Sequence, residues 1–100
     1  MDLEMAAMTI ISYSGDARTQ AFRSLALARE GKNDEAKELL NNAKEVSIKA
    51  HKAQTELLIE EANGGKLDIN ILLIHAQDHL MTSMLALELI QEMLYLYETK

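Results

Sequence analysis

Apolar residues recur at three- and four-residue steps in three long segments of the chain, which is the spacing of one helix face. The first segment covers about residues 2–30. Gly15 interrupts it, at a cost of roughly 1 kcal/mol relative to alanine, but the period continues on both sides. We therefore predict a single long helix, ended by Gly31, because glycine commonly follows the last helical turn.

The second segment covers about residues 34–63 and has two distinct faces. One face is a stripe of alanine, leucine and valine, whereas lysine and glutamate crowd the other, as expected for a solvated surface. Asn33 or Asp34 is suited to cap the free N–H groups of the first turn. Two glycines after Asn63 mark the end of this predicted helix.

The third segment covers about residues 68–98, with Asp68 as its expected N-cap, and is apolar around most of its circumference. A helix of this kind is buried on several sides. Two partner helices in a chain of 100 residues are too few to cover all of this surface. The pattern therefore predicts self-association through the third helix.

Two short connections between three helices predict an all-α fold. The expected architecture is an antiparallel three-helix up-down-up bundle, with helices about 45 Å long. Residues 1–100 form one domain, since the length allows no more. The absence of proline and the presence of only four glycines agree with long helices.

The composition excludes several functional classes. Ten Lys and Arg against 16 Asp and Glu give a net charge of −6, which disfavours binding to nucleic acid or to an anionic membrane surface. The lack of cysteine excludes disulfides, thiolate nucleophiles and thiolate metal sites. The N-terminus opens with acidic residues rather than a signal peptide, and no apolar run approaches the length of a membrane span. We expect a cytoplasmic protein that does not insert into the membrane.

The candidate chemistry lies in the third segment. At about 100° per residue, Asp78 lies about 60° to one side of His75, and His79 about 40° to the other. Thr82 falls between Asp78 and His75. Four polar groups thus share one patch on an otherwise apolar face, where each needs a partner or access to solvent.

Three interpretations of this patch stay open on the residues alone. In the first, it is a polar cluster in a helix interface, and the chain is a non-catalytic oligomerisation or adaptor module. In the second, His75 and His79 bind zinc, although the third ligand that a zinc hydrolase needs has no clear candidate. In the third, His75 is a nucleophile. A neutral imidazole nitrogen attacks phosphorus directly, and this chemistry needs a half-exposed histidine and a neighbour that fixes its ring, but no nucleotide loop.

A family resemblance favours the third interpretation. Residues 75–82 (HAQDHLMT) resemble the active-site motif of the enzyme IIA component of the bacterial phosphotransferase system, lactose/cellobiose (diacetylchitobiose) type. Residues 15–18 (GDAR) resemble that family's first-helix signature, and residues 50–55 (AHKAQT) its second-helix signature. The three motifs occur in the family's order, and the resemblance covers essentially the whole chain.

The resemblance implies a phosphoryl carrier. His75 matches the histidine that receives a phosphoryl group on Nε2 from the phosphocarrier protein HPr and passes it to a cysteine of enzyme IIB. The membrane enzyme IIC then takes up a β-linked disaccharide (cellobiose, diacetylchitobiose or lactose), which is phosphorylated as it crosses. The resemblance also implies a homotrimer with the third helices around its axis. Asp78 of each chain would meet there at a divalent cation, usually assigned as Mg²⁺, which would offset the repulsion between the carboxylates.

We also assign expected roles to two residues near His75 in the sequence. His79 either orients His75 or contacts the phosphoryl group, or else it is an interface histidine without a chemical role. Gln77 faces well away from His75 on the helix, so we expect it to have no catalytic role within the same chain.

The other two motifs also contain polar residues. We expect His51 and Gln54 to form hydrogen bonds between packed helices. Asp16 and Arg18 are expected to pair locally or to take part in a polar contact between helices.

Overall fold

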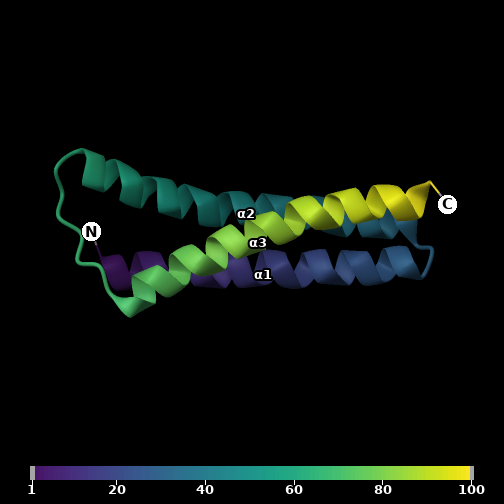
Figure 1. The fold of residues 1–100 in the computed structure, drawn as a ribbon, viewed down its shortest axis with the longest axis horizontal. Helices are drawn as coiled ribbons and strands as arrows, with labels where there is room; N and C mark the ends of the chain where they lie inside the picture. The colour runs from purple at the N-terminus through teal and green to yellow at the C-terminus, as the bar shows by residue number, and fades with distance from the viewer. Residues whose placement is uncertain (1, 100) are drawn as a thin grey trace.

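The fold is a bundle of three long helices. The computed structural model describes residues 2–99, and these form α1 (Leu3–Arg29), α2 (Asn33–Ala62) and α3 (Ile71–Glu98), with no strand among them. Successive helices run in opposite directions along a body of 52 × 20 × 15 Å (Figure 1). The predicted all-α, up-down-up architecture is confirmed.

The core combines small side chains on two helices with larger ones on the third. Alanines dominate the buried positions of α1 and α2, which lets these helices approach closely, whereas α3 contributes mainly leucine and isoleucine. α3 crosses the other two diagonally (Figure 1) and contacts α1 more extensively than α2. The side chains that are almost completely buried include Ile10, Leu40, Leu80 and Ile90.

Both predicted glycine ends are confirmed. Gly31 and Gly64 have φ values of 81° and 89°, the left-handed conformation that glycine adopts most readily. After α1, the N–H of Lys32 donates to the carbonyl of Leu27 at 3.0 Å, and that of Gly31 donates to Ala28 at 3.0 Å. These bonds satisfy carbonyls at the end of the helix that would otherwise lack partners.

The two predicted N-caps are wrong. Lys32 occupies the cap position of α2 and its side chain forms no capping bond, so neither Asn33 nor Asp34 caps this helix. α3 begins at Ile71, three residues after Asp68. Its cap is Asn70, which has extended backbone (φ −138°, ψ 173°) and accepts a hydrogen bond from the N–H of Leu73 at 2.8 Å.

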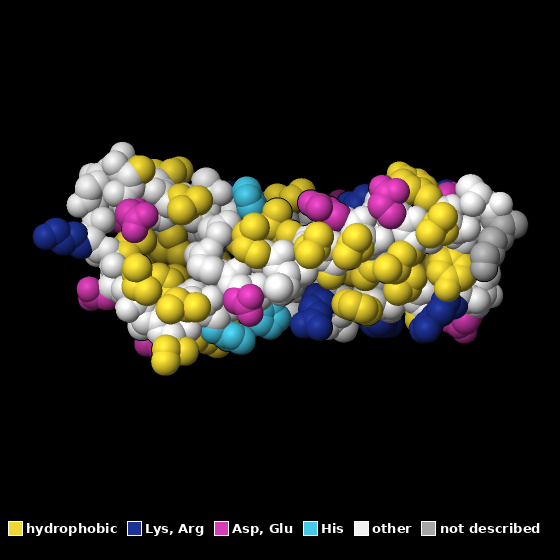
Figure 2. Space-filling model, viewed as in Figure 1, with side chains coloured by type: hydrophobic (Ala, Val, Ile, Leu, Met, Phe, Trp, Pro, Cys, Tyr) yellow, Lys and Arg dark blue, Asp and Glu magenta, His cyan; other side chains and the backbone are white. Residues whose placement is uncertain are grey.

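One face of α3 remains uncovered in the single chain. We define the α3 ridge as Asp78 together with six apolar side chains that are each more than half exposed: Ile71, Ile74, Met81, Leu85, Leu89 and Leu96. Figure 2 shows groups of apolar side chains along the length of the face on which α3 lies. Such a long exposed apolar surface is typical of an interface between proteins. Within residues 2–99, no helix is long and apolar enough to cross a membrane.

Candidate functional site

Two histidines contact each other in the first half of α3. His75 is exposed and His79, one turn later, is half-buried. Their ring centroids lie 5.3 Å apart and the ring planes meet at 86°, which is an edge-to-face contact. The contact restricts the orientation of the His75 imidazole while leaving that residue accessible to a partner.

His79 also contacts α1. A Cβ atom at Gly15 would lie 3.8 Å from Cε1 of His79, so the imidazole lies directly against the glycine. Nδ1 of His79 is buried and has no hydrogen-bond partner in the described chain. His79 and six residues of α1 line a groove of about 500 Å³; the α1 residues are Gly15, Arg18, Thr19, Phe22, Arg23 and Ala26. The candidate site is therefore this α1–α3 groove with His75 beside it.

The polar residues of the first motif make local contacts on α1, but with other residues of the helix and not with each other. Asp16 accepts a hydrogen bond from the side chain of Gln20 at 3.1 Å. The Arg18 guanidinium lies 5.8 Å from the centroid of the Phe22 ring, within the range of a cation–π contact. Arg18 thus remains on the wall of the groove rather than in a bond between helices.

Gln77, Thr82 and Asp78 of the same motif each have surroundings of their own. Gln77 faces away from His75, as predicted, and accepts a hydrogen bond from Gln54 of α2. Thr82 donates to the carbonyl of Asp78 at 2.9 Å, so its hydroxyl is bound to its own helix. Asp78 is exposed on the α3 ridge.

Of the two residues expected to connect helices, only one does so. Gln54 donates to Gln77, which confirms that expectation. The expectation for His51 is wrong within a single chain, because its side chain is exposed on α2 and the described residues offer it no hydrogen bond. A helical pattern places a residue on a face but does not show how far the partner helix extends over it.

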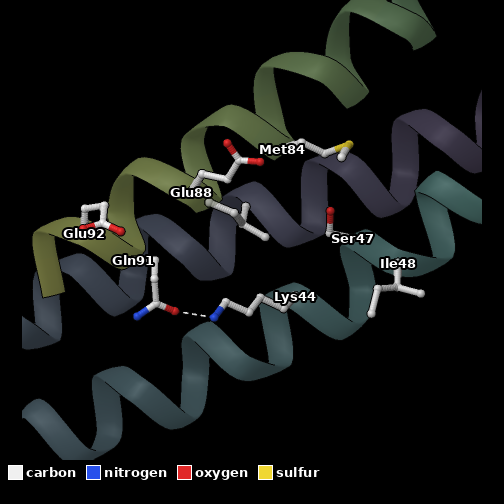
Figure 3. A pocket seen from close by; sticks show the side chains of 8 residues that line it. Lys44, Ser47, Ile48, Met84, Glu88, Gln91 and Glu92 are labelled. Atoms are coloured by element: carbon white, nitrogen blue, oxygen red, sulfur yellow. Dashed lines mark hydrogen bonds between the residues drawn. The ribbon is translucent and has the colours of Figure 1, made fainter. Parts of the chain in front are cut away.

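A second groove lies on the other flank of α3, against α2 (Figure 3). It measures about 400 Å³, and Lys44 donates a hydrogen bond to Gln91 inside it. Its other lining residues include Ile48, Met84 and Glu88, and no histidine. This groove is therefore separate from the candidate site.

The described residues of a single chain contain no cluster of metal-ligating side chains. Among residues 2–99, no three His, Asp or Glu side chains are grouped closely enough to hold one. His75 and His79 form a pair without a third ligand, so the structure gives the zinc interpretation no support. Asp78 supplies a single exposed carboxylate, an oxygen ligand of the kind that Mg²⁺ prefers.

Known proteins share this sequence and fold. A family model described as the lactose/cellobiose-specific IIA subunit of the PTS system matches residues 5–98. The lactose-specific EIIA component of Streptococcus mutans is 42% identical over 89% of this chain and 86% of its own length. The crystal structure of the cellobiose-specific enzyme IIA from Bacillus anthracis superposes with a TM-score of 0.95 at 43% identity, covering 99% of this chain and 91% of the other.

A third similar protein was solved together with a partner. It is the diacetylchitobiose IIA protein of Escherichia coli in complex with HPr, with a TM-score of 0.85 and 40% identity over 99% of this chain and 96% of the other. The family model and these identities over nearly full length confirm the resemblance carried by the three motifs. The chain therefore belongs to the lactose/cellobiose-specific IIA family and is a phosphotransferase component of a sugar phosphotransferase system.

Proposed function

We propose that the chain carries a phosphoryl group on His75 during the uptake of a β-linked disaccharide. The observation that carries the proposal is the pair of histidines: an exposed imidazole held edge-on by a half-buried one, beside a groove. This pair meets the needs of a phosphoryl carrier, which are an accessible nucleophile in a fixed orientation. Cellobiose, diacetylchitobiose and lactose are the candidate sugars.

The chemistry follows from a neutral imidazole. The lone pair of Nε2 of His75 attacks phosphorus, a new N–P bond forms, and the bond between phosphorus and the donor breaks as its electrons return to the donor. The hydrogen on Nδ1 stays on the ring. His79 holds the ring in place during the transfer. Arg18 and Arg23 place two positive charges in the adjoining groove of a chain with net charge −6, which favours the approach of an anionic phosphoryl group.

The proposed donor is HPr and the proposed acceptor is a cysteine of enzyme IIB. The structure of the Escherichia coli relative with HPr supports the donor. The acceptor rests on membership of the family, in which IIB transfers the group onward to the sugar carried by membrane enzyme IIC. We place the whole exchange in the cytoplasm.

We further propose that three copies assemble around their α3 helices. The α3 ridge exposes six apolar side chains, and burying them against other copies would remove that surface from water. Asp78 lies on this ridge, so three copies would bring three carboxylates to one axis. A divalent cation, Mg²⁺ by its preference for oxygen ligands, would be held by Asp78 of each chain and would neutralise their repulsion.

The decisive experiment is phosphoryl transfer from phosphoenolpyruvate through enzyme I and HPr. The wild-type protein should gain one phosphoryl group per chain, seen by intact mass and lost in acid. His75→Gln should gain none, because its amide nitrogen has no lone pair available for attack on phosphorus. A His75→Gln protein that still takes up phosphate would contradict the choice of nucleophile.

The same experiment tests the alternative of a non-catalytic oligomerisation or adaptor module. In that case the wild-type protein takes up no phosphate although HPr is phosphorylated in the same reaction. Replacement of His75 would then change stability alone.

A further inference from the structure

We propose that Gly15 of α1 is a positioning residue for phosphoryl transfer. The His79 imidazole packs against this small residue, and His79 in turn orients His75. The inference rests on the proposed function of His75 and adds a residue of another helix to that site.

The backbone does not require a glycine at position 15. The residue lies in the middle of α1, and positive φ angles among the described residues occur only at Gly31 and Gly64. A glycine inside a helix costs about 1 kcal/mol relative to alanine. Any limit on the size of the side chain at position 15 must therefore come from what surrounds it.

His79 of α3 is the side chain that lies against Gly15. Outside α1's own adjacent turns, Cε1 of His79 is the only described heavy atom within 4 Å of the position that a Cβ would occupy. The 3.8 Å separation is an ordinary van der Waals contact, so a methyl group fits. A longer side chain pointing toward the imidazole would occupy the space that the ring fills.

The His79 ring contacts His75 directly, so a movement of one ring reaches the other. Its Nδ1 is buried, and its ring meets the edge or face of the His75 ring at a centroid distance of 5.3 Å. A displacement of His79 therefore changes the contact that orients His75. Because phosphoryl transfer depends on the alignment of the attacking nitrogen, a shift of about 1 Å is enough to reduce the rate by about 100-fold.

Three variants test this inference. Gly15→Ala adds only the methyl group that fits, and it should also raise helix stability. Gly15→Leu adds the bulk that should displace His79. Ser12→Leu is the matched control, since it places the same uncharged side chain one turn earlier on α1 at an exposed position.

The readouts are the kinetics of phosphoryl transfer from HPr and the imidazole NMR resonances. Ser12→Leu should keep kcat within about twofold, whereas Gly15→Leu should lower kcat about 100-fold with KM for HPr unchanged. The loss of kcat in Gly15→Ala should be much smaller than in Gly15→Leu, because the methyl group is shorter than the leucine side chain. The resonances of His79 and His75 should move in Gly15→Leu, and those of His51 on α2 should not. Helix content and oligomeric mass should match the wild type in all three variants.

A double variant separates positioning from general damage. In a His79→Ala background, Gly15→Leu should cause little further loss of kcat, because the ring that it displaces is gone. Equal further loss in both backgrounds, or unmoved His79 resonances in Gly15→Leu, would overturn the role of Gly15 while leaving the proposed function intact. A wild-type protein that takes up no phosphate would instead overturn the proposed function, and the role of Gly15 in transfer with it.

Discussion

Single residues in the first half of α3 divide between two flanks. His79 lies against Gly15 of α1, whereas Gln77 is bonded to Gln54 of α2. The division follows from helix geometry, because side chains two residues apart on a helix point in nearly opposite directions. One flank therefore carries the candidate chemistry and the other connects α3 to α2.

The pair of glutamines should contribute measurably to stability. Gln77→Ala leaves the half-buried amide of Gln54 without its partner, and we expect the free energy of unfolding to fall by about 1 kcal/mol. The measurement is urea denaturation at a fixed protein concentration, because association would otherwise change the apparent stability. Gln54→Ala and the double variant complete the cycle. Strictly additive losses would show that the two side chains do not interact.

For single residues, the sequence predicted the direction in which a side chain points from its helix, but not the residue of another helix that it contacts. The helical repeat alone placed Gln77 away from His75, and its bond to Gln54 agrees. The repeat is silent on which residue of another helix meets His79, since that depends on how α1 and α3 are aligned. From the sequence, Gly15 was therefore only an interruption of the helical pattern, whereas in the structure His79 packs against it.

At the scale of elements, the helix ends were easier to predict than the helix starts. The chain has a positive φ just after α1 and after α2, a conformation that glycine adopts most readily, so a glycine in the sequence marked each end. An N-cap has several suitable residue types. Asp68 and Asn70 both qualify, and the path of the connection from α2 selects Asn70, whose backbone is extended where the helix begins.

The cap of α3 supplies a direct test of that selection. Asn70→Ala removes the oxygen that accepts from the N–H of Leu73, and we expect a loss of about 1 kcal/mol in the free energy of unfolding. Asp68→Ala is the matched control and should change it by less than about 0.5 kcal/mol, as an exposed residue outside the helix. Denaturant titration of both variants gives the answer. A larger loss for Asp68→Ala would mean that α3 begins earlier than described.

At the scale of the whole molecule, one chain leaves its most apolar helix half covered. The bundle buries one side of α3, but six large side chains of the α3 ridge stay more than half exposed. The sequence predicted this exposed apolar surface, because apolar residues occur around most of the circumference of α3. The number of copies that cover it does not follow from the pattern, because an apolar face specifies burial and not symmetry.

Asp78 provides the test of that assembly. If three copies meet at the α3 ridge, Asp78→Leu replaces three converging carboxylates by apolar side chains, so the trimer should stay intact or become tighter. Sedimentation equilibrium over a dilution series measures the association. Asp16→Leu is the matched control, because it removes an exposed carboxylate from α1 and should leave the association unchanged.

The same series tests the proposed cation. A chelator should loosen the wild-type trimer by exposing the repulsion between its carboxylates, and it should have no effect on Asp78→Leu, which has no carboxylate at that position. Dissociation of Asp78→Leu into single chains would contradict the axial placement of Asp78. A wild-type trimer indifferent to chelation would retain the assembly but remove the cation from it, since packing of the α3 ridge would then suffice to hold three like charges together.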